Sequence, residues 1–184
     1  MLKLSVLDQS VVSYGQPQDT AIRQTLNLAQ RCEEWGYARF WVSEHHNLPS
    51  IAGTAPEVLL AAIAARTTRI RLGSAGVMLP HYAPFKVAEQ FRVLDALAPG
   101  RIDLGLGRAP GSDGRTSSLL NPDRYASERF PQQVVELQAW VSGTPFPPGH
   151  PAHGVVAQPT GASVPSLWIL GSSNYGAQLA AHLG

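Results

Sequence analysis

The chain has 184 residues, of which 44% are hydrophobic and 15% are charged, and its formal net charge is +1. This length suits one globular domain with a proper core and is short for two, so we expect a single domain over residues 1–184. A net charge near zero gives no electrostatic case for binding nucleic acid or an anionic membrane. The single cysteine, Cys32, excludes an internal disulfide bond and is compatible with a reducing compartment. Residues 1–10 lack the apolar run of a signal peptide, and no stretch resembles a membrane span, so a soluble cytoplasmic protein is expected.

The apolar pattern predicts strands that alternate with helices along the chain. Strands are expected at residues 2–7, 40–43, 70–72, 102–104 and 167–170. Helices are expected at residues 19–35, 54–66, 84–97, 130–141 and 174–183. Asp19 is the expected cap of the first helix, and Thr54 to Glu57 fits a capping box for the second. Polar residues 111–124 and the Pro- and Gly-rich residues 143–164 are expected to be irregular.

This alternation predicts a parallel sheet with helices packed against it. Two architectures fit: an open, doubly wound sheet and a (β/α)8 barrel, which needs about 250 residues. The number of strands by itself favours the open sheet. In both architectures ligands bind at the loops that follow the carboxyl ends of the strands. The strand–helix–strand stretch 69–111 organises the chain, so its loops 74–81 and 107–114 are the first candidates for a site.

Glu44, His45 and His46 directly follow the second predicted strand. Because side chains alternate across a strand, Glu44 and His46 would share one face and His45 would take the other. A histidine at the mouth of such a fold could act as a general base or orient a substrate near neutral pH. The alternative is a pair of loop histidines bonded to backbone. No ligand spacing connects them with His150 and His153, so no metal site is predicted.

Gly73 to Gly76 is a run of four tiny side chains near the end of the third strand. Such residues let a flat ligand approach the backbone, or they serve tight packing, and the sequence alone does not decide. The stretch Gly105 to Arg108 ends the fourth strand with a fixed positive charge suited to a phosphate or a carboxylate. It is not a dinucleotide fingerprint, because the third glycine of GxGxxG would fall at Pro110.

Gly171 to Asn174 precedes the last predicted helix. Free N–H groups at a helix start, together with nearby hydroxyls, can bind a phosphate, although ordinary capping by Ser173 or Asn174 is an alternative. Arg108 and the Ser172–Ser173 turn would both lie at strand ends and would suit the same phosphate. Their joint occurrence favours a phosphoryl ligand.

Four segments carry a resemblance to a known family: WVSEHHN (41–47), GSAGVMLPHYAP (73–84), AEQFRVLDALAPGRIDLGLGRAPG (88–111) and LWILGSSNYGAQLAAHLG (167–184). In this order and spacing they resemble the bacterial luciferase-like flavin monooxygenase family, and above all its single-component, alkanal-monooxygenase-like branch. The resemblance implies a (β/α)8 barrel that binds reduced FMN at its carboxyl mouth, activates O2 and oxidises an organic substrate. It outweighs the preference for an open sheet and implies a TIM-barrel type truncated after about five βα units.

The resemblance also assigns roles to particular residues. It implies that His45 is the catalytic base and that Arg108 binds the FMN phosphate. It implies a non-prolyl cis peptide at Ala75–Gly76 that supports the isoalloxazine ring. The remaining phosphate ligands that it implies are Ser172, Ser173 and the N–H group of Gly176.

The function expected from the resemblance is an FMN-dependent monooxygenase that acts on paired donors, with incorporation of O2, and on a small aldehyde-like substrate. Nothing in the chain resembles a dinucleotide site of its own, so a separate flavin reductase would supply the reduced FMN. A homodimer is implied, and no metal, nucleic acid or membrane partner is expected. Two alternatives stay open: a truncated, catalytically silent flavin-binding protein, and a deazaflavin-dependent hydride-transfer enzyme on the same barrel.

Overall fold

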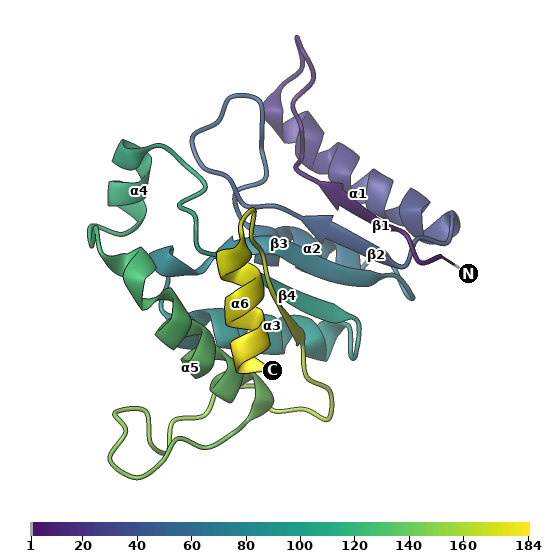
Figure 1. Cartoon of the computed structure of the whole chain (residues 1–184). Coiled ribbons are helices and arrows are strands. Elements are labelled where there is room, and N and C mark those ends of the chain that lie inside the picture. Colours follow the sequence, from purple (N-terminus) through teal and green to yellow (C-terminus); the bar gives the residue numbers. More distant parts are fainter. Residues whose placement is uncertain (1) are drawn as a thin grey trace.

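The computed structural model describes residues 2–184 and shows one sheet of five parallel strands (Figure 1). The strands are β1 (Ser5–Asp8), β2 (Arg39–Val42), β3 (Arg71–Met78), β4 (Ile102–Gly107) and β5 (Ser166–Ile169). They are hydrogen-bonded in the order β1-β2-β3-β4-β5, so each strand pairs with its neighbours along the chain. A doubly wound sheet reverses its strand order at a switch point, and this sheet does not. The preference for an open, doubly wound sheet is therefore wrong, and the TIM-barrel type of α/β fold is confirmed.

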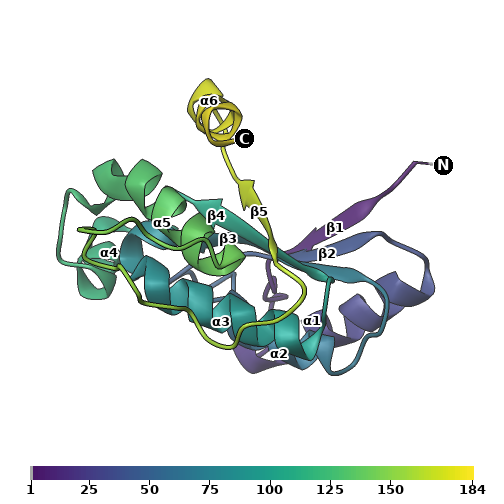
Figure 2. The same ribbon diagram turned by 90° about the horizontal axis from the view of Figure 1, so that it is seen from below.

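The main helices cover one face of this sheet. Helices α1 (Gln18–Glu34), α2 (Pro56–Ala64), α3 (Pro84–Leu97) and α5 (Phe130–Ser142) lie together on that face, whereas α6 (Asn174–Leu183) lies apart from them, beyond β5 (Figure 2). Two short 3-10 helices, η1 (Leu79–His81) and η2 (Ala126–Arg129), complete the connections near the start of α3 and α5. Among residues 2–184, no helix combines the length and the apolar character that crossing a membrane requires.

An additional short helix, α4 (Gly114–Leu120), lies in the stretch that we expected to be an irregular loop. The carboxylate of Asp113 caps it by accepting hydrogen bonds from the N–H groups of Arg115 (2.9 Å) and Thr116 (3.0 Å). These hydrogen bonds and further ones from the Thr116 hydroxyl and the Asn47 side chain lower the pKa of Asp113 below its usual range. The polar residues therefore serve a helix start, which their loop-like composition conceals.

Two expected helix caps are wrong. Helix α1 begins at Gln18, and the Asp19 carboxylate instead pairs with Arg23 one turn further along, at 2.7 Å. Helix α2 has Ala55 at its cap position and Pro56 in its first turn, and no side chain of the expected capping box caps it. A proline in the first turn has no N–H group to satisfy, so the helix needs one hydrogen-bond acceptor fewer.

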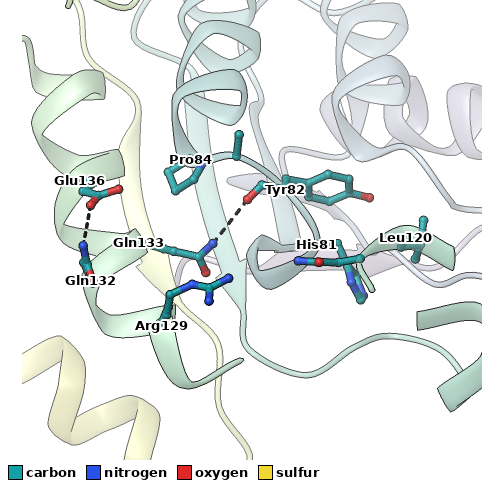
Figure 3. A pocket seen from close by; sticks show the side chains of 10 residues that line it. His81, Tyr82, Pro84, Leu120, Arg129, Gln132, Gln133 and Glu136 are labelled. Carbon is teal, nitrogen blue, oxygen red and sulfur yellow. Dashed lines mark hydrogen bonds between the residues drawn. The ribbon is translucent and has the colours of Figure 1, made fainter. Parts of the chain in front are cut away.

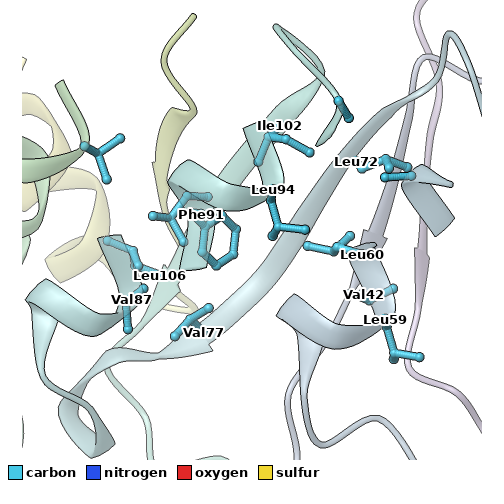
Figure 4. Packing of buried hydrophobic residues seen from close by; sticks show 14 of the residues in the cluster. Val42, Leu59, Leu60, Leu72, Val77, Val87, Phe91, Leu94, Ile102 and Leu106 are labelled. Atoms are coloured by element: carbon cyan, nitrogen blue, oxygen red, sulfur yellow. The ribbon is translucent and has the colours of Figure 1, made fainter. Parts of the chain in front are cut away.

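The hydrophobic core lies between the sheet and helices α2, α3 and α5 (Figure 4). Alternate residues of each strand point into it, as Leu72 of β3 and Leu106 of β4 do, because side chains alternate across a strand. Phe91 of α3 is fully buried in this core. The core therefore fills the helix-covered face of the sheet.

The opposite face of the sheet carries a charged and aromatic cluster. The Asp103 carboxylate has no solvent exposure. It accepts hydrogen bonds from Arg39 Nε (3.1 Å) and from Trp168 Nε1 (3.1 Å). Arg71 donates two more, one from its Nε (3.0 Å) and one from a terminal guanidinium nitrogen (2.6 Å). The rings of Trp41 and Trp168 pack edge to face with their centroids 5.7 Å apart. These side chains connect β2, β3, β4 and β5 below the carboxyl ends of the strands.

Strand β3 is longer than its sequence suggests. We expected it to end at Leu72, with a loop over residues 74–81, but it continues to Met78, so the tiny residues 73–76 lie inside the strand. Its pairing with β4 shifts register between Ser74 and Val77. There the Ser74 hydroxyl donates to the Gly105 carbonyl (2.8 Å) and accepts from the Gly105 N–H (3.0 Å). The Ala75–Gly76 peptide is cis, as the resemblance implies.

Candidate functional site

A pocket of about 680 Å³ opens beside the carboxyl ends of β1 to β5. Its lining contains every predicted site residue except Gly76, which is bonded to the lining residue Ala75. The lining residues are Gln9, His45, Ala75, Met78, Gly107, Arg108, Ala109, Phe130, Ile169, Leu170, Gly171, Ser172, Ser173, Tyr175 and Gly176. Segments far apart in the sequence therefore meet at one site, as expected for ligand sites on parallel α/β folds.

The inner wall of this pocket depends on a close approach between β3 and β4. A Cβ added at Gly76 would lie 2.8 Å from the Gly105 carbonyl oxygen and 2.9 Å from Leu170 Cδ1. A Cβ added at Gly105 would overlap the carbonyl oxygen of Ser74. The glycines thus serve backbone packing, which was one of the two readings of the small-residue run. Ala75, which directly precedes Gly76, presents only a methyl group to the pocket.

The turn between β5 and α6 is tight and leaves its donors free. A Cβ added at Gly176 would lie 3.2 Å from both Gly171 Cα and the Leu170 carbonyl oxygen, so glycines let the helix start pack against the strand end. Ser173 occupies the cap position but makes no side-chain cap hydrogen bond, so the alternative of ordinary capping by Ser173 is wrong. Within residues 2–184, the hydroxyls of Ser172 and Ser173 have no hydrogen-bond partner, and the first N–H groups of α6 have none inside the helix. These donors all suit an anion.

Arg108 is held close to the same turn. It follows the last residue of β4, and its guanidinium carbon lies 4.0 Å from the centre of the Tyr175 ring, in the first turn of α6. A cation–π contact uses the face of the guanidinium and leaves its N–H groups available to a ligand. Sequence reasoning missed Tyr175; the aromatic residue directly after Gly-Ser-Ser-Asn was the available signal.

Glu44 anchors the segment that carries the two histidines. Its side chain is buried, with 1% exposure. The Oε1 atom accepts a hydrogen bond from the Tyr82 hydroxyl (2.6 Å) and lies 2.8 Å from His46 Nε2. The Oε2 atom accepts a hydrogen bond from the Met78 N–H group (2.9 Å). Burial and the hydrogen bond to Glu44 raise the pKa of Tyr82 well above its usual range. Glu44 and His46 share a face, as the alternation predicted, but this anchoring role of Glu44 was missed.

His45 lies on the other face and lines the pocket. Its Nδ1 lies 3.2 Å from the hydroxyl of Ser43, and its backbone N–H donates to the Gly53 carbonyl at 2.9 Å. The backbone N–H groups of both histidines donate to carbonyl groups, that of His46 to Gly111 (3.0 Å), as in the alternative of loop histidines bonded to backbone, and their rings contact the side chains of Ser43 and Glu44. The ring of His45 is oriented where it can meet a ligand.

A separate pocket of about 450 Å³ lies outside this mouth, between residues 81–84 and α5 (Figure 3). Here the Gln133 side-chain nitrogen donates to the Tyr82 carbonyl (3.4 Å), and Gln132 donates to Glu136 (2.9 Å). None of the predicted site residues lines it. The residues 2–184 contain no cluster of three or more His, Cys, Asp or Glu side chains placed to hold a metal ion.

Comparison with known proteins identifies the family. The family described as luciferase-like monooxygenase matches residues 2–184. The chain is 51% identical to the uncharacterised protein YwcH of Bacillus subtilis (strain 168), over 100% of this chain and 55% of that protein. It is 46% identical to N-acetyl-S-alkylcysteine monooxygenase of the same organism, again over 100% of this chain and 55% of that protein. Among solved structures, apo-MsnO8 superimposes with a TM-score of 0.89 at 40% identity, over 100% of this chain and 54% of that one.

More distant structures share the fold alone. The oxygenating constituent of 3,6-diketocamphane monooxygenase of Pseudomonas putida, in complex with FMN, has a TM-score of 0.75 at 18% identity, over 92% of this chain and 51% of that one. An F420-dependent secondary alcohol dehydrogenase has a TM-score of 0.73 at 16% identity, over 99% of this chain and 56% of that one. The chain spans about half the length of the curated relatives it matches. Because the family matches almost every residue, this chain belongs to the luciferase-like monooxygenase family.

Proposed function

We propose that this chain carries the FMN site of a monooxygenase that uses reduced FMN and O2 to oxidise a small organic molecule. The observation that supports this proposal is the pocket that gathers Arg108, the free donors of the β5–α6 turn and the small residue Ala75. One end of the pocket suits a phosphate, and the rest offers a narrow surface for a flat ring. Its volume of about 680 Å³ lies within the range of cofactor sites.

Each part of the pocket has a role in this proposal. Arg108, the hydroxyls of Ser172 and Ser173, and the N–H group of Gly176 hold the phosphate by charge-assisted hydrogen bonds. The Ala75–Gly76 segment supports the ring from β3. His45 exchanges or shares a proton with the bound molecules. The pocket's apolar side chains, such as Leu170, exclude water. When bound, reduced FMN would supply the electrons that activate O2.

The partners and substrate are part of the same proposal. A separate NAD(P)H-dependent reductase supplies the reduced FMN, because the chain contains no dinucleotide fingerprint. The reaction acts on paired donors and incorporates oxygen into an aldehyde-like substrate. One relative is named for N-acetyl-S-alkylcysteine, so a thioether of this type belongs beside aldehydes in a substrate panel. We propose a cytoplasmic homodimer as the working form.

The first test is an FMN titration followed by flavin fluorescence. Loss of one charge-assisted hydrogen bond costs about 1.5–3 kcal/mol, so Arg108→Ala should weaken FMN binding about 10- to 100-fold. Arg115→Ala is the matched control, because Arg115 is exposed on α4 and does not line the pocket. Riboflavin, which lacks the phosphate, should bind the wild type and Arg108→Ala equally. Equal FMN affinity of wild type and Arg108→Ala would place the phosphate elsewhere and overturn this assignment.

A deazaflavin-dependent hydride transfer is the second candidate, because the fold is shared with an F420-dependent dehydrogenase. Titration with F420 beside FMN distinguishes the two, since the cofactor that binds tighter identifies the class. Reaction of the FMN complex, after chemical reduction, with O2 and the substrate panel then tests oxidation. Product formation supports the monooxygenase, whereas flavin uptake without any oxidised product identifies a catalytically silent flavin-binding protein.

A further inference from the structure

The side chain of Ser43 lies directly behind His45. Ser43 follows β2 and is 2% exposed, and its Oγ lies 3.2 Å from Nδ1 of His45. Ser43 comes directly after the end of β2, and His45, two residues further on, lines the pocket. Within residues 2–184, His45 Nδ1 is the only hydrogen-bond partner of the Ser43 hydroxyl. This single contact therefore determines which nitrogen of the His45 ring carries the hydrogen.

A serine hydroxyl can either donate to Nδ1 or accept from an Nδ1–H group. If it accepted, its own hydrogen would be buried without an acceptor, and an unsatisfied buried donor costs about 1–3 kcal/mol. If it donates, both the hydroxyl hydrogen and the Nδ1 lone pair are satisfied. The burial of Ser43 therefore favours donation, which places the hydrogen of the neutral imidazole on Nε2. Because Nδ1 is turned toward Ser43, Nε2 is the ring nitrogen available to the pocket.

We propose that Ser43 is a positioning residue that holds neutral His45 in its Nε2–H form, so that His45 presents a hydrogen-bond donor to the pocket. The catalytic meaning of this assignment rests on the proposed function. The resemblance implies a base at His45, which would need a free lone pair on Nε2. The contact with Ser43 instead makes neutral His45 a donor toward an oxygen or nitrogen of the cofactor or substrate. No proton needs to leave the ring for this interaction.

Nuclear magnetic resonance tests the proposal on the whole chain without cofactor. Two-bond ¹H–¹⁵N correlation of ¹⁵N-histidine-labelled protein identifies which ring nitrogen carries the hydrogen, at about pH 8, above the ordinary histidine pKa. His45→Gln assigns the signal by its disappearance. The expected result is a hydrogen on Nε2 of His45 and an Nδ1 resonance shifted by an accepted hydrogen bond. A hydrogen on Nδ1 in the wild type would overturn the proposal, whatever the flavin experiments show.

Ser43→Ala tests the part played by the hydroxyl. The Nδ1 resonance of His45 should move to the position of an unbonded ring nitrogen, and an unchanged resonance would contradict the proposal. Ser43→Cys, a weaker donor of similar shape, should give an intermediate shift and serves if the alanine variant does not fold. Ser142→Ala is the matched control, because Ser142 lies at the end of α5 and its hydroxyl bonds only its own helix end and Thr144.

The same variants separate positioning from binding. If the FMN site is as proposed, Ser43→Ala should leave FMN affinity within about twofold and lower kcat about fivefold to tenfold, as expected for one lost orienting hydrogen bond of about 1 kcal/mol. A parallel loss of FMN affinity would show that Ser43 supports the pocket as a whole rather than the ring of His45. Absence of flavin binding in the wild type would refute the proposed function and leave the resonance result standing.

Discussion

The charged cluster around Asp103 leads to the sharpest stability prediction. Its carboxylate is completely buried and accepts hydrogen bonds from Arg39, Arg71 and Trp168. Asp103→Asn keeps the volume of the side chain but removes the charge and turns amide hydrogens toward guanidinium donors. Guanidinium groups stay protonated in proteins, so both arginines keep their charge after the substitution. Two cations would then face each other without a counterion.

The magnitude follows from the burial of the partners. Breaking a fully buried ion pair costs about 3–5 kcal/mol. The side chains of Arg39 and Arg71 are 27% and 30% exposed to solvent, so solvent screens part of the lost ion-pair energy. We therefore expect Asp103→Asn to lower the free energy of unfolding by about 2–3 kcal/mol. For a chain of this size that corresponds to a melting temperature about 4–12 °C lower.

Urea unfolding followed by circular dichroism is the appropriate assay, with thermal unfolding as a second measure. Asp19→Asn is the control, because Asp19 forms an exposed ion pair with Arg23 and its loss should leave the urea midpoint unchanged. The effect of Asp103→Asn should persist in high salt, since salt screens buried charges weakly. Equal midpoints for Asp103→Asn and Asp19→Asn would show that the cluster contributes no stability and would refute this reasoning.

Three further variants test other parts of the fold. Tyr82→Phe removes one of the hydrogen-bond donors to the buried carboxylate of Glu44. It should lower the free energy of unfolding in urea by about 1–3 kcal/mol, whereas an unchanged free energy would mean that water replaces the hydroxyl. Gly105→Ala places a methyl group against the carbonyl of Ser74 and should lower both stability and FMN affinity; wild-type affinity would show that the β3–β4 contact yields easily. Partial burial raises the pKa of Glu33, but three consecutive backbone N–H donors before β3 outweigh it and hold that pKa below its usual range. The stabilisation by ionised Glu33 is therefore present above its unfolded-state pKa and is lost as the pH falls through its folded-state pKa. The loss of unfolding free energy caused by Glu33→Gln at neutral pH should accordingly shrink in acid. A loss that stays constant with pH would contradict this prediction.

The sequence predicts the framework of this fold because each signal is local. Period-two and period-3.6 patterns place the main helices and the strands within a few residues, except for the end of β3, which lies six residues beyond the expected Leu72. Residues at strand ends were sufficient to choose Arg108 and the Ser172–Ser173 turn as candidates for one site, because parallel strands bring their carboxyl ends to one edge. The choice between an open sheet and a barrel depended on the family resemblance, since the number of strands is compatible with both.

What the sequence did not predict depends on contacts between distant segments. Gly73 to Gly76 resembles a loop by composition, yet it lies inside β3, where the side chains of Trp41 and Leu170 occupy the space that a Cβ on Gly73 or Gly76 would need. Tyr175 becomes a site residue only because the end of β4 brings Arg108 onto its ring. The anchoring of Glu44 likewise requires Met78, at the end of β3, and Tyr82 to lie beside the residues that follow β2. Such pairings follow from the tertiary structure and have no local pattern.

The strand order has a consequence for how this sheet forms during synthesis. Each strand pairs with the one made immediately before it, so every new βα unit can add to a surface that has already left the ribosome. Within residues 2–184 no strand waits for a distant partner, which keeps the separation of contacting residues small for a parallel sheet. The proposed phosphate site follows the same order, because Arg108 comes from β4 and the other donors come from the turn after its neighbour β5. If the FMN site is as proposed, FMN binding would therefore report on whether the unit of β5 and α6 has docked onto β4.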